Sequence, residues 1–299
     1  LCVCSKNDPK ISKEAFIKHK HMKLKLEDIS VFVSDYNNKA DNIKKISKIL
    51  NLNLDSFIFF DDSKVECEFV KTKLPEVMVI NLNDDPSEFV EKIESIAPFY
   101  FKNITKEDFN RVNSYRKITL FNKERSESKN LDGFLKSLKA KITLEKINKV
   151  NCERASQLIA KTNQFKLNSK LFSPKNLLFK KEKCIPISFK DKFQNYGIIG
   201  VFVYSINKKL RTLFIENWVM SCRVFSRRIE NYIIDYLKDK SHRQKCDFIG
   251  FNFNITKKNL YLQNFLKELG IKLSNNNNSY LIKLNKIKNS KRNYISLSK

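Results

Sequence analysis

The chain has 299 residues, 41% hydrophobic and 12% aromatic, which is a globular composition with room for two domains. It carries 58 Lys and Arg against 32 Asp and Glu, a formal net charge of +26, but the lysines are spread along the whole sequence. This spread is typical of a coding bias, so we do not expect a nucleic acid partner, although basic proteins attract polyanions. No uncharged apolar run of about 18 residues and no signal-peptide pattern occurs, so we expect no membrane span and a cytoplasmic protein.

The cysteines show no paired metal-ligand spacing, so the sequence predicts no zinc site. Reduced thiols in the cytosol are the simplest account of them. They are Cys2, Cys4, Cys67, Cys152, Cys184, Cys222 and Cys246.

Strand and helix patterns alternate in the first part of the chain, and this alternation predicts a parallel sheet flanked by helices. Asn7, Asp8 and Pro9 form a good helix start. The expected elements are a strand at 1–5, a helix at 13–21, a strand within 23–36, a helix at 42–52, a strand at 56–60, a helix at 64–74 and a strand at 76–82.

Helical patterns then dominate from Asp84 to Lys139, including a highly charged connecting helix at 106–128. The remaining chain is predicted to form a second domain with a mixed sheet. Its expected elements are strands at 141–147, 196–206, 211–221, 246–253 and 280–287, and helices at 152–165, 227–240 and 259–270. We therefore divide the chain into domains at 1–100 and 139–285, a helical linker at 101–138 and a basic tail at 286–299.

Two adjacent acids, Asp61 and Asp62, directly follow the apolar strand at 56–60. Open α/β sheets bind ligands at the carboxyl ends of their strands, so this position favours a metal or phosphate site. The alternative is that one of the two caps the next helix by accepting hydrogen bonds from its free N–H groups.

Several motifs in this order resemble the FkbH-like proteins, in which a haloacid-dehalogenase-type (HAD, subfamily IIIC) phosphatase domain precedes a GNAT-like acyltransferase domain. They cover nearly the whole chain and are "CSKND" (4–8), "NKADNI" (38–43), "LDSFIFFDDSKVE" (54–66), "KTNQFKLNS" (161–169), "WVMSCRV" (218–224) and "ITKKNLYLQNFLKELG" (255–270). In such phosphatases a D-x-D motif on an earlier strand supplies the nucleophile. None precedes Ser5, so the resemblance implies an N-terminally truncated chain without a central strand, and we expect this half to be poorly stable alone.

The resemblance also implies roles for single residues in phosphoryl chemistry with Mg²⁺. Ser5 would donate a hydrogen bond to a phosphoryl oxygen, with Asn7 beside it, and Lys39 would neutralise developing charge. Asp61 would coordinate Mg²⁺, and Asp62 would bind it through water or orient the site. The alternatives are that Lys39 is a surface lysine and Ser5 a helix cap.

FkbH-like proteins are associated with taking a glyceryl unit from 1,3-bisphosphoglycerate, removing its phosphate and handing the unit to an acyl carrier protein. A thioester intermediate needs a thiolate, and Cys4 is the candidate by its position beside the phosphate site. Cys222 is the competitor. For both, the alternative is a small buried apolar residue.

GNAT-like domains bind the coenzyme A pyrophosphate with a turn of the form R/Q-x-x-G-x-G/A at a helix start. Arg223 fits this pattern, but Ser226 and Arg228 stand at the two glycine positions and argue against ordinary coenzyme A binding. Arg227 and Arg228 could instead pair with the phosphate of a phosphopantetheine arm, or be solvated arginines at a helix start.

Asn163, Gln164 and Asn259 could line an acceptor cleft or satisfy backbone groups at loop ends, and Trp218 is expected in the core. The leading hypothesis is an FkbH-like enzyme of secondary-metabolite, polyketide or surface-glycan biosynthesis. It would transfer a small phosphorylated acyl unit to an acyl carrier protein. The alternatives are an acyl or acetyltransferase with another donor and a non-catalytic module that binds a carrier protein.

Overall fold

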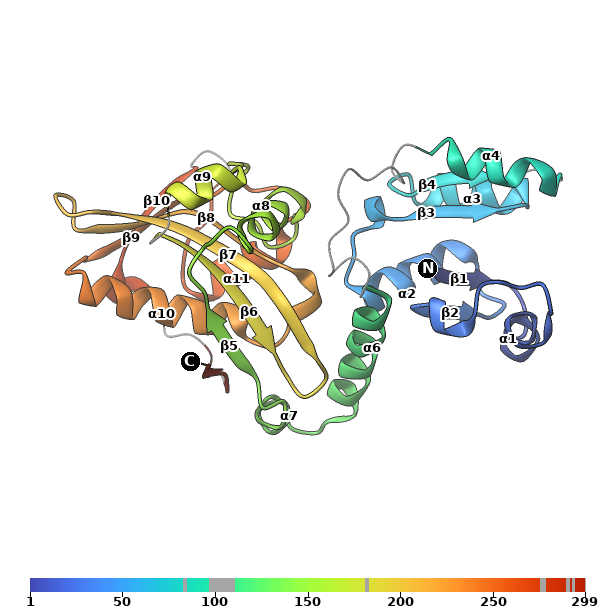
Figure 1. Ribbon diagram of the computed structural model, residues 1–299, viewed down its shortest axis with the longest axis horizontal. Coiled ribbons are helices and arrows are strands. Elements are labelled where there is room, and N and C mark those ends of the chain that lie inside the picture. Colours follow the sequence, from blue (N-terminus) through green and yellow to red (C-terminus); the bar gives the residue numbers. More distant parts are fainter. Residues whose placement is uncertain are drawn as a thin grey trace. The chain divides into compact units, whose positions relative to one another are not determined.

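The computed structural model describes residues 1–82, 85–96, 111–180, 183–274, 278–288, 291 and 294–298. The chain divides into two compact units, Leu1–Glu124 and Arg125–Lys299, and their boundary falls inside the predicted linker (Figure 1). Residues 101–110 of that linker, and residues 289, 290, 292, 293 and 299 of the predicted tail, lie outside the described residues. No helix in the described part of the chain is long and apolar enough to cross a membrane.

The first unit alternates strands and helices, as predicted. Its elements are β1 (Cys2–Ser5), α1 (Pro9–Lys18), β2 (Val31–Ser34), α2 (Lys39–Leu50), β3 (Ile58–Asp61), α3 (Lys64–Lys73), β4 (Met78–Asn81), α4 (Phe89–Glu94) and α6 (Arg111–Glu127), which runs into the second unit. Short polar residues begin the helices, because their side chains accept from otherwise free backbone N–H groups. Asp8, Asn38 and Ser63 cap α1, α2 and α3 in this way.

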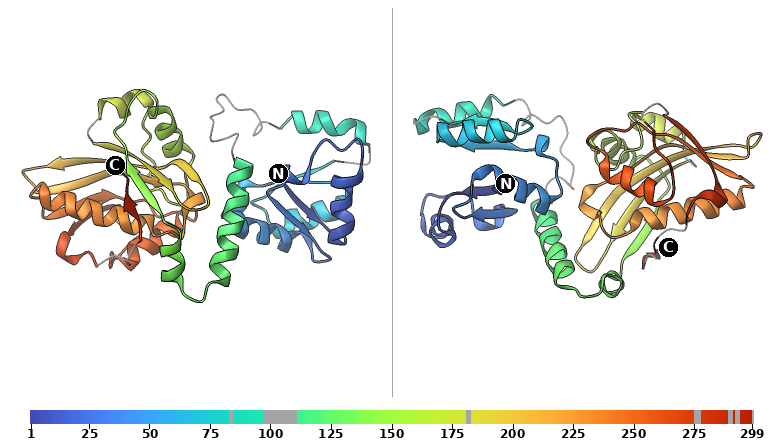
Figure 2. Two further views of the ribbon diagram at one scale, coloured as in Figure 1. Left: turned by 60° about the horizontal axis from the view of Figure 1, so that its bottom comes forward. Right: turned by 180° about the vertical axis from the view of Figure 1, so that it is seen from behind.

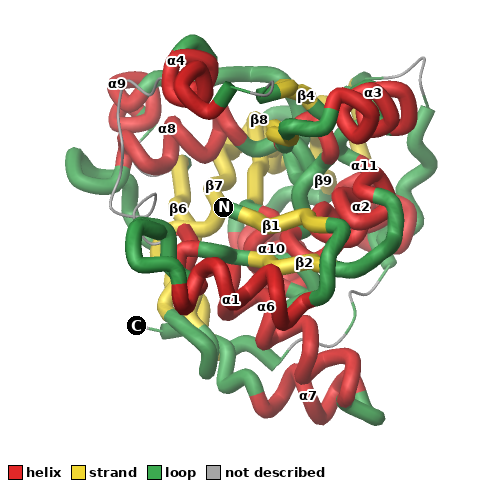
Figure 3. Tube along the Cα trace, turned by 90° about the vertical axis from the view of Figure 1, so that its right-hand side faces the viewer, coloured by secondary structure: helices red, strands yellow, loops and turns green. Residues whose placement is uncertain are grey.

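The strands of the first unit form two separate parallel pairs. β1 pairs with β2 (Figures 1 and 3), and β3 pairs with β4 (Figure 1). Among the described residues, β1 and β3 belong to no common sheet, so each pairs along one edge only. The predicted parallel pairing is therefore present, but the sheet is divided between β1 and β3.

Helix α2 joins the two strand pairs through its apolar side. Ile43 packs in the cluster that contains Phe59 of β3, and Ile46 packs in the cluster that contains Val31 of β2. Cys4 touches both clusters. Ile43 and Ile46, whose spacing in the sequence predicts one helical face, therefore pack into two different small cores.

The second unit contains a seven-stranded mixed sheet in the order β10-β9-β8-β7-β6-β5-β11. Two of its pairings, β8 with β9 and β5 with β11, are parallel, and the others are antiparallel. The strands are β5 (Lys141–Leu144), β6 (Cys184–Lys190), β7 (Asn195–Asn207), β8 (Thr212–Met220), β9 (Phe248–Asn252), β10 (Ser279–Lys283) and β11 (Ser296–Leu297). The helices are α7 (Leu131–Ser137), α8 (Cys152–Lys161), α9 (Pro174–Phe179), α10 (Ile229–Arg243) and α11 (Leu260–Glu268).

Helices cover both faces of this sheet (Figure 2). Val201 and Val219 pack in one cluster with residues of α8 and α9. On the other face, Phe202 contacts Tyr236 of α10, and Trp218 contacts Phe265 of α11. Trp218 is 1% exposed, which confirms its predicted place in the core.

The segment 165–168 lies where β8 and β9 stop pairing with each other. Their parallel ladder runs only from Thr212 to Ile215 on β8. Beyond it, the Leu167 N–H donates to Trp218 O (3.0 Å), and the Asn254 N–H donates to Leu167 O (3.3 Å). The predicted motif at 161–169 therefore supplies backbone partners between the diverging strands.

Candidate active site

The carboxyl ends of the strands in the first unit place four polar residues at matching positions. Ser5 lies opposite Ser34 in the first pair, and Asp61 lies opposite Asn81 in the second. This is the edge at which parallel sheets bind ligands. Asp61, one of the two acids singled out in the sequence, thus lies at the edge of the sheet where a ligand was expected.

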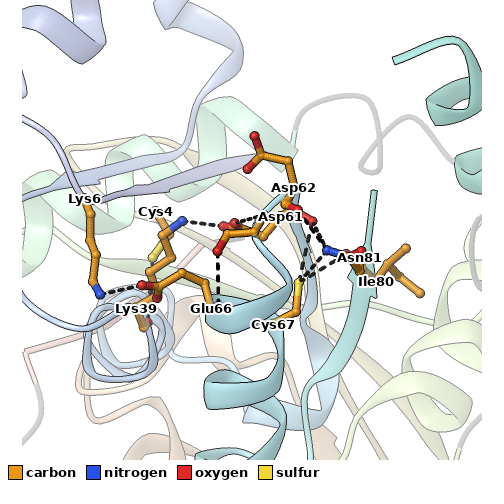
Figure 4. Close-up of polar contacts among 10 residues, drawn as sticks. Cys4, Lys6, Lys39, Asp61, Asp62, Glu66, Cys67, Ile80 and Asn81 are labelled. Carbon is orange, nitrogen blue, oxygen red and sulfur yellow. Dashed lines mark hydrogen bonds and ion pairs between the residues drawn. The ribbon is translucent and has the colours of Figure 1, made fainter. Parts of the chain in front are cut away.

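A buried ion pair joins the two strand pairs. Lys39 Nζ, from the first residue of α2, contacts Asp61 Oδ2 at the end of β3 (Figure 4). The side chains are 13% and 6% exposed, so this is not a surface lysine. Asp61 Oδ1 also accepts from the Ser63 N–H at 3.0 Å, so both carboxylate oxygens have partners. Asp61 therefore supports the turn before α3 as well as the ion pair, whereas the residue that caps α3 is Ser63 and not one of the two acids.

Asp62 is exposed, and its carboxylate points away from that of Asp61 (Figure 4). Among the residues that the structure describes, no three His, Cys, Asp or Glu side chains come together as a metal-binding group. Mg²⁺ requires near-octahedral oxygen coordination. Asp61 is neutralised by Lys39 and Asp62 is turned away, so these residues by themselves do not fit a magnesium ion.

The site also contains residues that the sequence reasoning missed. Lys6 Nζ contacts Glu66 Oε1 at 2.5 Å, which gives a second ion pair between the segment after β1 and α3. Asn81 Nδ2 donates to the carbonyl oxygens of Asp61 (3.2 Å) and Asp62 (3.1 Å), so it holds the backbone of the acidic turn (Figure 4). The signal was present, because Asn81 is a polar residue at the end of an apolar strand, like Asp61.

Cys4 lies beside the ion pair, as its predicted role required, but its environment disfavours a thiolate. Burial raises the pKa of the Cys4 thiol to about 11, and the nearby Lys39 ammonium only partly opposes this. Cys4 Sγ is 3.7 Å from the carbonyl oxygen of Lys39. At neutral pH the thiol is therefore protonated, which is a poor state for a nucleophile.

Ser5 is half-buried at the end of β1, and its carbonyl oxygen accepts from the Asp35 N–H at 3.1 Å. Asn7 is exposed, and its Oδ1 accepts from the Asp8 N–H at 2.8 Å in the turn that starts α1. The structure thus brings Cys4, Lys39 and Asp61 together. It places Asn7 in a turn, where its side chain supports the backbone.

The turn before α10 keeps a glycine-like backbone without glycine. Ser226 and Arg228, at the two predicted glycine positions, have φ values of 66° and 59°. These left-handed conformations cost non-glycine residues free energy and are held by the surrounding structure. The backbone is therefore left-handed at both positions that the resemblance assigns to glycine, although neither residue is glycine.

The arginines of this turn are engaged with the protein. Arg227 is 3% exposed, and its guanidinium contacts Asp191 (2.9 Å) and the Tyr196 hydroxyl (2.6 Å). Arg228 pairs with Asp132 at 2.8 Å, and the Arg223 Nε–H donates to Ser221 Oγ at 3.3 Å. The Arg227 contacts stabilise the fold, and phosphate binding there would require breaking a buried ion pair.

The candidate acceptor-cleft residues are dispersed. Asn163 is exposed, Gln164 is half-buried, and Asn259 is buried. Asn259 Nδ2 donates to Asn254 O at 2.7 Å, and its Oδ1 accepts from the Thr256 N–H at 3.0 Å. For Asn259 the observed contacts are therefore those of the alternative, a residue that satisfies backbone groups. Cys222 is half-buried in the short helix Cys222–Val224.

No family model and no curated protein matches this chain. Among solved structures, it is similar to the N-terminal part of the protein BF1531 from Bacteroides fragilis, which contains a phosphatase domain complexed with Mg. That match has 40% identity and a TM-score of 0.33, covers 34% of this chain, and spans only 27% of the Bacteroides fragilis chain.

Matches to acetyltransferases are more distant in sequence. The ribosomal-protein-S18-alanine N-acetyltransferase from Escherichia coli has 11% identity and a TM-score of 0.33, and the match covers 43% of this chain and 76% of that one. The IAA acetyltransferase from Bacillus cereus has 12% identity and a TM-score of 0.30, with 42% and 74% covered. The chain is thus similar in part to a phosphatase domain and in part to acetyltransferases.

Proposed function

We propose that this chain belongs to a two-part enzyme that acts on a small acyl phosphate carrying a second phosphate ester. The thiol of a carrier protein's phosphopantetheine arm attacks the acyl carbon, the acyl phosphate leaves as inorganic phosphate and a thioester forms, and water hydrolyses the remaining phosphate ester to a hydroxyl and phosphate. The observation that carries the proposal is the buried Lys39–Asp61 pair at the carboxyl ends of the parallel strands. A buried cation at this edge is suited to an anionic phosphoryl group.

The first unit would bind the phosphoryl group. An incoming phosphate could take over the Lys39 ammonium, and Ser5 would add a hydrogen bond from the end of β1. Asn81 would keep the acidic turn in place during this exchange.

The nucleophile is proposed to come from a further parallel strand. β1 and β3 each pair along one edge only, so a strand between them could pair with both and join the two small sheets. This strand would end beside Lys39 and Asp61, where the resemblance to HAD-type phosphatases places an aspartate. It would also bury apolar surface that the divided sheet leaves partly covered.

The second unit would bind the acyl acceptor. Its mixed sheet and the glycine-like turn before α10 agree with a GNAT-like acyltransferase, but the contacts of Arg227 with Asp191 do not favour ordinary coenzyme A binding. A carrier protein that presents its own phosphopantetheine arm is the acceptor we propose.

The test uses the complete protein with Mg²⁺, 1,3-bisphosphoglycerate and a phosphopantetheinylated carrier protein, followed by phosphate release and intact-mass measurement of both proteins. We expect phosphate release and a glyceryl-sized adduct on the carrier, both lost in Lys39→Met and retained in Lys71→Met, which removes an exposed ion pair within α3. Cys4→Ala and Cys222→Ala would show whether either thiol carries the unit on the way. Phosphate release that is equal in Lys39→Met and the unmodified protein would contradict the proposal.

A non-catalytic carrier-binding module is the second candidate. Two observations favour it: Asp61 is neutralised by Lys39, and the Cys4 thiol is protonated at neutral pH. In that case the same experiment gives saturable carrier binding with no phosphate release and no adduct.

A further inference from the structure

A cavity of about 310 Å³ lies at the start of α10, entirely within the second unit. Its volume is at the lower end of the range for small-ligand sites, about 300–1,000 Å³, so it would admit a small molecule. Arg125, Arg228 and Lys291 bring positive charge to its wall, and Glu268, which pairs with Lys291 at 2.8 Å, brings negative charge. Leu131 and Phe265 give it an apolar part.

Glu230, the second residue of α10, lines this cavity and is only 7% exposed. Its Oε1 accepts from the Tyr261 hydroxyl at 2.9 Å. Its Oε2 is buried and has no hydrogen-bond partner among the described residues. A buried carboxyl oxygen without a partner is costly, so a hydrogen-bond donor that reached it would stabilise the site.

The surroundings of Glu230 fix its geometry. The Tyr261 hydroxyl accepts from the Ser226 N–H at 3.2 Å, so its own proton is directed to Glu230. Burial raises the pKa of Glu230. Hydrogen bonds from its own backbone N–H and from the Tyr261 hydroxyl oppose this effect, the Glu268 charge adds to it and the Lys291 charge reduces it. A ligand that carries a positive charge would compensate the ionised carboxylate.

We propose that this cavity binds a small α-amino acid, with its ammonium group on Glu230 Oε2 and its carboxylate beside Arg125 and Arg228. An ammonium group supplies three donors and the charge that a buried carboxylate lacks. A guanidinium group is suited to a carboxylate, and Arg228 would exchange part of its contact with Asp132, which is half-exposed, for the ligand.

A phosphate group fits this position less well. The Ser226 N–H at the turn is already occupied by the Tyr261 hydroxyl, and Glu230 Oε2 would face the phosphate oxygens. The proposal concerns the second unit alone and does not depend on the phosphoryl chemistry of the first.

The experiment is isothermal titration calorimetry on the full chain with glycine and L-alanine. Propionate, which keeps only the carboxylate, ethylamine, which keeps only the ammonium group, and inorganic phosphate serve as comparison probes. We expect saturable binding of the amino acids, and binding weaker by about tenfold or more for each comparison probe. Equal binding of propionate and alanine, preferred binding of phosphate, or no binding of either amino acid would overturn the proposal.

Two variants test the residues. Glu230→Gln keeps the shape and removes the charge. Arg228→Gly removes the guanidinium at a position whose φ of 59° suits glycine, so the turn should fold without strain. Both should weaken amino acid binding by about tenfold or more. Arg211→Gln, which removes a guanidinium paired with Asp247 outside the cavity, should leave it unchanged. Unchanged binding in a folded Arg228→Gly protein would remove the carboxylate part of the proposal.

Discussion

Replacing Lys39 by Met should destabilise the first unit without altering the second. The Lys39–Asp61 pair is buried on both sides, with side chains 13% and 6% exposed. Met preserves an unbranched stem beside the Phe59 ring, over which Lys39 Nζ lies at 5.9 Å. The variant therefore removes the charge and retains most of the packing.

The expected loss in the free energy of unfolding is about 3 kcal/mol, at the lower end of the range for leaving a buried charge unpaired. Asp61 would keep only the hydrogen bond from the Ser63 N–H, and its Oδ2 would lose its partner. In the double variant Lys39→Met with Asp61→Asn, the charge is gone from both sides. Most of the loss should therefore be recovered, with a coupling free energy of about 2 kcal/mol or more.

Urea denaturation can follow the two units separately. The chain has one tryptophan, Trp218, which lies in the second unit, so its fluorescence reports that unit, whereas far-UV circular dichroism reports both. We expect Lys39→Met to lower the urea midpoint of the first unit, which appears in circular dichroism alone. The midpoint of the fluorescence transition, which reports the second unit, should stay unchanged. The control Lys6→Met removes a pair with 39% and 18% exposed side chains and should cost no more than about 1 kcal/mol. Equal losses in Lys39→Met and Lys6→Met, or a double variant as unstable as the sum of its single changes, would refute the reasoning.

Four further results are expected. The rate of Cys4 alkylation, followed by peptide fragmentation that distinguishes it from the exposed Cys2, should be slow at neutral pH and rise toward pH 11, because burial raises the thiol pKa from 9.0 to about 11. Fast alkylation of Cys4 at pH 7 would contradict this. The same shift should reduce stability as the pH rises from 9 to 11, since the unfolded thiol ionises first. Arg227→Met should lower the free energy of unfolding of the second unit, followed by fluorescence, by about 3–5 kcal/mol, because the side chains of Arg227 and Asp191 are 1% and 0% exposed. A loss below about 1 kcal/mol would argue against a structural role for this ion pair. Gly250→Ala should destabilise the second unit by about 1–3 kcal/mol, because the added Cβ would lie 2.7 Å from the Phe214 ring. Gly133→Ala in α7 should be neutral or stabilising, because the nearest atom to its added Cβ would be 3.6 Å away.

The sequence by itself determined the local elements where pattern and end signals agree. The alternation of β1 to β4 with α1 to α3 followed from apolar runs, helical spacing and capping residues such as Asp8 and Asn38, which act within a few residues of chain. The acids after β3 were identified for the same reason. β6 was missed, and it contains Pro186, a residue that ordinarily argues against a strand between two neighbours.

Only the tertiary structure decided what the charged residues do. Nothing in the spacing along the chain shows that Lys39 neutralises Asp61, that Arg227 is buried against Asp191, or that Glu230 has an oxygen without a partner. Each of these depends on segments distant in sequence that pack into low-dielectric surroundings, where the presence or absence of one partner changes the free energy of a charge. The sequence identified which residues carry chemical groups, and the packing decided which of those groups are available to a ligand.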